Sequence, residues 1–130
     1  MRVRLTTRDQ LAGTVDEVYA LVTDPAFQEA KCVATTDDSH QFTVDVTGSP
    51  GTARVRTERH LPSETLPDVA KSFVGEHLTV IEVHTWSLPG PDGSRESVLD
   101  LHVKGAPLTL KGTLRLEPSR GGAVQVLDAE

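Results

Sequence analysis

The sequence has few cysteines and few aromatic residues. Its 130 residues include one cysteine, one tryptophan, one tyrosine and three phenylalanines. With Cys32 alone the chain cannot form an internal disulfide, which is typical of proteins from a reducing compartment. Aromatic residues make up only 4% of the chain, so we do not expect stacking of flat rings to dominate ligand recognition. These scarcities favour a cytoplasmic protein with an aliphatic interior.

Long apolar runs and an excess of positive charge are also absent. No window approaches the roughly 18 consecutive apolar residues that span a bilayer, and the polar start "RVRLTTRD" lacks the apolar region of a signal peptide. Thirteen Lys and Arg against nineteen Asp and Glu give a formal charge of −6, which would repel a nucleic acid. We expect one cytoplasmic domain over residues 1–130, with no nucleic-acid partner and no stable membrane insertion.

Two short helices are predicted near the start of the chain. Thr14 and Glu17 form a capping box, after which apolar residues repeat at helical spacing at Val15, Val18, Tyr19 and Val22. Asp24 and Pro25 end this helix and begin another, with Asp24 as N-cap and Pro25 in the first turn. The second helix has a weaker apolar stripe at Phe27, Ala30 and Ala34, and is expected to fray by Thr36.

Most of the remaining chain alternates apolar and polar residues with a period of two, the pattern of half-buried strands. One strand is expected at "RVRLTT", residues 2–7, and six follow residue 40, joined by turn sequences such as "PGPDG" and "EPSRGG". A short amphipathic helix, Leu66–Phe73, is expected between strands three and four. Gly112 interrupts an alternation of leucines and predicts a bulge or a close backbone approach.

The first hairpin after the helices can be given a register. Closing it symmetrically on "GSPG" brings its apolar and charged residues into cross-strand pairs, which supports the assignment. The predicted pairs are Phe42 with Thr57, Val44 with Val55, Val46 with Ala53, Asp45 with Arg54 and, by extension, His40 with Arg59.

The predicted fold class is α+β. A seven-stranded antiparallel meander twists and curves, and two consecutive helices after the first strand can seal one end of it. Its inner face is expected to be aliphatic, from Phe42, Val44, Val46, Val55, Leu99, Leu101, Leu110 and Leu114.

Three segments carry a resemblance to a known superfamily: "TTRDQLAGTVDEVYALVTDPAFQEAK", "FVGEHLTVIEVHTW" and "GAPLTLKGTLRLEP". With this order of elements, the chain resembles the helix-grip fold of the START-like (SRPBCC) superfamily, which includes polyketide cyclases, lipid-transfer domains and the birch-pollen allergen. It looks most like an uncharacterised actinobacterial family of unknown function. The resemblance implies a cavity between sheet and helices that holds a hydrophobic or lipid-like molecule.

One departure from this superfamily concerns the C-terminal grip helix, which crosses the inner face of the sheet. The chain ends at "VLDAE", in or just after the last strand, so we expect a domain truncated at its C-terminal end. Otherwise the Leu66–Phe73 helix or a second subunit would cover this face. An uncovered apolar face drives association, so a homodimer through that face is a further expectation.

The candidate ligand-binding residues follow from the inner face: Phe42, Val44, Val55, Arg59, His84, Trp86, Leu99, Leu101, Leu110 and Leu114. For Glu82, His84 and Trp86 the alternation leaves the facing open, because Ile81 and Val83 compete for the core. An inward Arg59 could hold a ligand carboxylate or phosphate, or it could lie at a solvated strand end.

Reactive groups are sparse. The five histidines lack metal-ligand spacing and no cysteine pair supports them, so no metal or cofactor is expected. Cys32 is expected to be a small packing residue. Binding of a hydrophobic small molecule is therefore preferred. The alternatives are a cyclase or hydrolase using His84, Glu82 and Arg59, and a protein-interaction module using the exposed sheet face.

Overall fold

The structure is a computed structural model that describes residues 4–35, 42–48, 51–62, 77–105 and 108–130. Its elements in chain order are β1 (Leu5–Leu11), α1 (Val15–Val22), α2 (Pro25–Thr35), β2 (Phe42–Thr47), β3 (Ala53–Pro62), β4 (His77–Trp86), β5 (Arg95–Val103), β6 (Thr109–Ser119) and β7 (Gly122–Ala129). The predicted helix Leu66–Phe73 lies outside the described residues.

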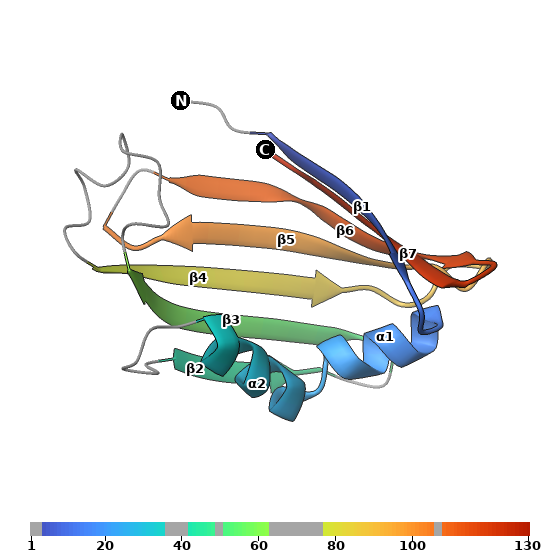
Figure 1. The fold of residues 1–130 in the computed structure, drawn as a ribbon, viewed down its shortest axis with the longest axis horizontal. Helices are drawn as coiled ribbons and strands as arrows, with labels where there is room; N and C mark the ends of the chain where they lie inside the picture. The colour runs from blue at the N-terminus through green and yellow to red at the C-terminus, as the bar shows by residue number, and fades with distance from the viewer. Residues whose placement is uncertain (1–3, 36–41, 49–50, 63–76, 106–107) are drawn as a thin grey trace.

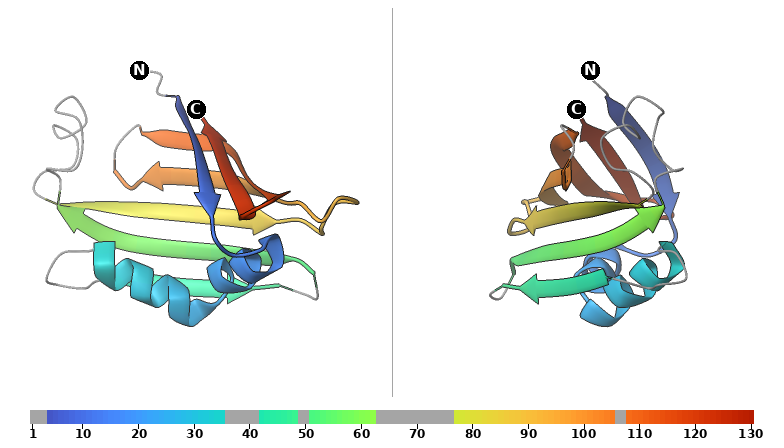
Figure 2. Two further views of the ribbon diagram at one scale, coloured as in Figure 1. Left: turned by 45° about the vertical axis from the view of Figure 1, so that its right-hand side comes forward. Right: turned by 90° about the vertical axis from the view of Figure 1, so that its left-hand side faces the viewer.

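All seven strands form one antiparallel sheet in the order β1-β7-β6-β5-β4-β3-β2. Strands β2 to β7 are a meander, and β1 closes the far edge by pairing with β7 (Figure 1). The sheet curves, and both helices lie on the same side of it (Figure 2). We call the side that the helices cover the inner face and the opposite side the outer face. The α+β prediction, with a curved seven-stranded antiparallel sheet and two short helices after the first strand, is confirmed.

The helices begin where the sequence predicts. Thr14 caps α1: its Oγ1 accepts a hydrogen bond from the Glu17 amide, and the Glu17 carboxylate accepts one from the Thr14 amide, both at 3.2 Å. Asp24 accepts from the Ala26 amide at 2.9 Å and so caps α2. No helix among the residues described is both long and apolar enough to cross a membrane.

Strand β1 extends further along the chain than expected. The alternation predicts residues 2–7, of which 2 and 3 lie outside the described residues, whereas β1 runs from Leu5 to Leu11. Its seven residues all pair with β7, from Leu5 opposite Ala129 to Leu11 opposite Ala123. The backbone ladder extends the strand through the polar "TTRDQ", so tertiary pairing overrides the weak local pattern.

The predicted hairpin register is wrong by two residues. The observed pairs are Phe42 with Arg59, Val44 with Thr57, Asp45 with Arg56 and Val46 with Val55. Gly51 has a φ of 84°, a conformation that favours glycine, and places the turn one residue later than a symmetric "GSPG" closure. Moving a turn centre by one residue moves the pairing by two. Because side chains alternate with a period of two, every predicted face is kept.

The larger core cluster joins α1 to the sheet. Its buried members are Val15, Val55, Trp86, Leu116 and Ala123. Tyr19 of α1 meets Trp86 edge-on, with ring centroids 5.6 Å apart and planes at 83°. The Arg95 guanidinium lies 3.7 Å from the centroid of the Tyr19 ring, and its NH1 donates to the Gly51 carbonyl at 2.8 Å. These contacts fix α1 against β4, β5 and the β2–β3 turn.

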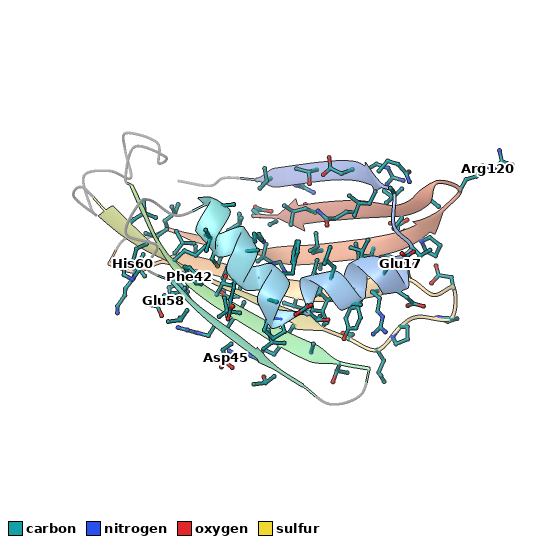
Figure 3. The ribbon with its side chains drawn as sticks, turned by 60° about the horizontal axis from the view of Figure 1, so that its bottom comes forward. Glu17, Phe42, Asp45, Glu58, His60 and Arg120 are labelled. Carbon is teal, nitrogen blue, oxygen red and sulfur yellow. The ribbon has the colours of Figure 1, made fainter. Side chains whose placement is uncertain are left out.

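The outer face carries charged side chains in cross-strand pairs. Lys111 lies near Asp100, and Arg115 near Glu96. Asp45, Glu58 and His60 are labelled in Figure 3 beside β2 and β3, and the register places all three on the outer face. Ile81 also faces outward although it is only 9% exposed. The outer face therefore has a partly apolar centre between charged flanks.

Gly112 marks a close backbone approach, one of the two predicted possibilities. It is opposite Leu99 on β5 and opposite Ala129 on β7, without a break in either ladder. A Cβ built at Gly112 would lie 2.5 Å from Cα of Ala129 and still closer to the carbonyl oxygen of Asp128. Only glycine fits without moving the backbone of β7.

We therefore expect Gly112→Ala to lower the free energy of unfolding by about 1–3 kcal/mol, the usual cost of overpacking. Chemical denaturation in urea measures this change. Gly13→Ala is the matched control, because the nearest atoms to a Cβ there are at 3.5 and 3.6 Å, ordinary contact distances. Equal stability of the two variants would contradict this account of Gly112.

Candidate functional site

A pocket with a volume of ≈ 190 Å³ lies between the inner face and the helices. Its lining is mixed, with six apolar side chains and five polar ones. The apolar group is Val22, Val55, Trp86, Leu99, Leu114 and Leu127, and the polar group is Gln28, Lys31, Glu82, His84 and Gln125.

The floor of the pocket is a row of cross-strand neighbours. Val55 on β3 is opposite His84 on β4, and His84 is opposite Leu99 on β5. The next inward-facing residue of β4 is Trp86, which is opposite Ser97 on β5, and Ser97 is opposite Leu114 on β6. The register therefore brings residues 44 positions apart in the chain onto one surface.

Helix α2 supplies Gln28 and Lys31 from above this floor. Gln28 is buried at 6% exposure, and its Nε2 donates to the Val22 carbonyl at 2.6 Å. That bond satisfies a carbonyl at the end of α1, which explains why a polar side chain is tolerated there. The predicted stripe Phe27, Ala30 and Ala34 is wrong for α2, since Ala30 and Ala34 are exposed. Gln28 and Cys32, four residues apart, face the sheet instead.

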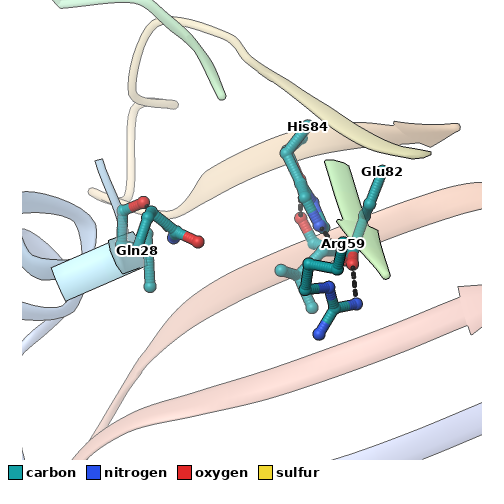
Figure 4. A network of polar contacts seen from close by, with 7 residues as sticks. Gln28, Arg59, Glu82 and His84 are labelled. Atoms are coloured by element: carbon teal, nitrogen blue, oxygen red, sulfur yellow. Dashed lines mark hydrogen bonds and ion pairs between the residues drawn. The ribbon is translucent and has the colours of Figure 1, made fainter. Parts of the chain in front are cut away.

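Three charged or polar side chains form a network on the inner face, which we call the polar trio: Arg59, Glu82 and His84. Arg59 NH2 donates to Glu82 Oε2 at 3.1 Å, and His84 Nε2 lies 2.7 Å from Glu82 Oε1. Glu82 is thus held between a guanidinium from β3 and an imidazole from its own strand (Figure 4). Each of the three side chains is between 13% and 16% exposed.

The carboxyl of Glu82 is ionised over the whole neutral range. Burial acts to raise its pKa, but the His84 hydrogen bond and the neighbouring His84, Lys31 and Arg59 groups outweigh burial. Together they lower the pKa from 4.5 to about 2. A buried carboxylate of this kind is stable only while its partners remain.

The contact with Glu82 requires a proton on Nε2 of His84. At 2.7 Å a proton must lie between Nε2 and the Glu82 carboxylate, so Nε2 donates. The other ring nitrogen, Nδ1, is 3.4 Å from the hydroxyl of Ser97, which is also 3.5 Å from the Leu114 carbonyl. Ser97 has no exposed surface. Both nitrogens of His84 are engaged, and the adjoining hydroxyl is out of reach of a substrate.

Cys32 is a buried residue of α2 that does not line the pocket. It is 1% exposed, and burial raises the pKa of its thiol even though Arg59 and Lys31 act in the opposite direction. A neutral, buried thiol is a poor nucleophile. Within the described ranges, no group of three or more His, Cys, Asp or Glu side chains is placed to hold a metal ion.

The ten predicted site residues all lie on the inner face. Half of them line the pocket: Val55, His84, Trp86, Leu99 and Leu114. Arg59 is linked to the pocket through Glu82, and Leu101 packs with a second core cluster of Leu78, Val80 and Val103. Phe42, Val44 and Leu110 are half-buried elsewhere on that face. Arg59 is opposite Phe42, whereas its predicted partner His40 lies outside the described residues.

The sequence interpretation missed five lining residues: Val22, Gln28, Lys31, Gln125 and Leu127. Leu127 continues the alternation of β7 and could have been found from that pattern. Gln28 and Lys31 gave no such signal, because their side of α2 carries no apolar stripe in the sequence. Glu82 is not among the ten predicted ligand-binding residues, because the alternation leaves its facing open and only the strand register shows that it faces inward.

The lowered pKa of Glu82 predicts a pH-dependent stability. A folded pKa below the unfolded value means that the stabilisation is complete above about pH 4.5 and is lost as the pH falls towards 2. The full difference is roughly 3 kcal/mol. Urea denaturation at a series of pH values should give a slope in this window that Glu82→Gln reduces by the contribution of this one carboxyl.

The matched control for this titration is Glu96→Gln. Glu96 is on the outer face, 49% exposed, with its carboxylate 3.7 Å from Arg115, so its removal should change stability little. If Glu82→Gln kept the wild-type slope between pH 4.5 and 2, Glu82 would not be the carboxyl responsible.

Comparison with known proteins gives one match. A family model described as "Protein of unknown function (DUF2505)" matches residues 6–130. Searches of curated proteins and of solved structures each found no match. Since the family model spans nearly the whole sequence, including both helices and all seven strands, the chain belongs to the DUF2505 family.

Proposed function

We propose that the chain binds a small, mainly apolar carboxylic acid in the pocket between the sheet and the two helices. The observation that carries this proposal is the combination of an apolar lining with the polar trio and Lys31 at one side. Ligand sites commonly have this composition: apolar walls and a few placed polar groups. The arrangement of sheet and helices is consistent with the resemblance to the helix-grip superfamily. Members of that superfamily hold hydrophobic molecules.

The charges near the pocket favour an anionic group. Arg59 and Lys31 carry two positive charges, and Glu82 carries one negative charge that is already bonded to Arg59 and His84. Over these four side chains alone the charges sum to a positive value even with a neutral His84. A ligand carboxylate beside these side chains is therefore stabilised electrostatically, whereas a ligand ammonium group would be repelled.

The pocket volume sets the size of ligand that it holds alone. An apolar cavity of about 150 Å³ accommodates benzene, so ≈ 190 Å³ suits about eight non-hydrogen atoms. Drug-sized sites are larger, about 300–1,000 Å³. The pocket by itself fits a short-chain or single-ring acid.

The cyclase or hydrolase alternative is less well supported by the same groups. Neither nitrogen of His84 is directed at a pocket ligand, because Nε2 donates to Glu82 and Nδ1 lies beside Ser97. Ser97 is fully buried and does not line the pocket. A general base needs a lone pair within reach of the substrate. Binding without reaction is therefore the preferred function.

The test compares octanoate, octanol and octylamine by isothermal titration calorimetry. We expect octanoate to bind with a dissociation constant of about 0.01–1 mM, given typical ligand efficiencies, and to bind at least fivefold more tightly than the other two. Lys31→Met should weaken octanoate about fivefold and leave octanol unchanged. The control Lys111→Met removes a Lys on the outer face that is 70% exposed, and should change neither.

Two outcomes would overturn the proposal. If none of the three compounds bound, the pocket would not be a site for small apolar ligands. If octanol or octylamine bound as tightly as octanoate, the preference for a carboxylate would be wrong.

A further inference from the structure

A second, larger concave space adjoins the pocket. This groove has a volume of ≈ 520 Å³ and is open to solvent. Its walls are mostly apolar and come from β1, α1, α2 and β7. The side chains that matter to the argument are Leu11, Val18, Leu21 and Phe27. We call this space the α1 groove.

The α1 groove adjoins the pocket. Val22, the last residue of α1, and Gln125, on β7, line both spaces. Gln125 is opposite Asp9 of β1 and opposite Leu116 of β6 on the inner face. These two half-buried side chains lie between the smaller, partly charged pocket and the larger, mostly apolar groove.

The distribution of polarity along the two spaces is uneven. Lys31 and the polar trio are associated with the pocket, and within the groove lining the polar side chains are Glu17 and Gln125. Leu21 is 48% exposed in the groove, and covering it would remove apolar surface from water. A molecule that extends from pocket to groove therefore meets charge at one end and apolar surface at the other.

We infer that the ligand is a single-chain amphiphile, a carboxylate with an alkyl chain longer than the pocket can hold, whose chain passes between Val22 and Gln125 into the α1 groove. This inference rests on the proposed function and adds to it the length and shape of the ligand. An alkyl chain is the occupant that the adjacency of the two spaces supports, because most of the groove lining is apolar and so suits an apolar chain better than a polar one.

The inference predicts how affinity depends on chain length. Hexanoate fits within the pocket, so its affinity should not depend on the groove. Each methylene beyond hexanoate enters the groove, where it is buried on one side, and should tighten binding about twofold to fourfold. Dodecanoate should bind at least tenfold more tightly than octanoate when both are titrated below their critical micelle concentrations.

Leu21→Gln tests the groove separately from the pocket. Leu21 lines the groove but not the pocket. Because its side chain is exposed, we expect the variant to fold. We expect dodecanoate to bind about fivefold more weakly to this variant, with hexanoate unchanged. Leu88→Gln is the matched control: Leu88 is 64% exposed, follows β4 and lines neither space, so both affinities should be kept.

The possible results distinguish failure of this inference from failure of the proposed function. If hexanoate and octanoate bound but dodecanoate bound no more tightly, the inference would be overturned and the proposed function would stand. If no acid bound, the proposed function itself would fail. If sedimentation showed a dimer that Leu21→Gln dissociated, the groove would be an interface between copies of the chain, which also overturns the inference.

Discussion

The contact of Tyr19 with Trp86 and Arg95 is the interaction on which the rest of this structure depends. It joins a short helix, which would be unstable alone, to the middle of a seven-stranded sheet. Val22 lies three residues after Tyr19 and so projects from nearly the same side of α1. Fixing Tyr19 therefore fixes the residue that lines both the pocket and the α1 groove.

The polar trio is costly to keep in an interior of this kind. Replacing a buried ion pair with apolar residues of similar volume is often neutral or stabilising, whereas removing one partner is strongly destabilising. Arg59, Glu82 and His84 compensate one another through two short contacts. Stability alone does not explain the presence of the trio. The recognition role that we propose at the pocket would supply a reason, because the trio places charged groups beside an otherwise mainly apolar lining.

Local patterns predicted much of the fold because they reflect short-range physics. The capping box at Thr14, the break at Asp24 and the period of two in the strands depend on neighbouring residues alone. The inner-face set was predictable for the same reason, and it survived the wrong hairpin register because a shift of two residues preserves side-chain facing. Gly112 was likewise recognisable from its place among leucines, although only the packing against Ala129 distinguished a close approach from a bulge.

The sequence by itself determined the elements, their order and the faces of most strands. Only the tertiary structure decided the facing of Glu82 and His84, because Ile81 and Val83 made both faces of β4 plausible until β3 and β5 were paired with it. The same holds for Gln28 and Lys31 on α2, whose role depends on which side of the helix meets the sheet. These features arise from contacts between residues distant in the chain, and the free energy of such contacts is not encoded in any local pattern.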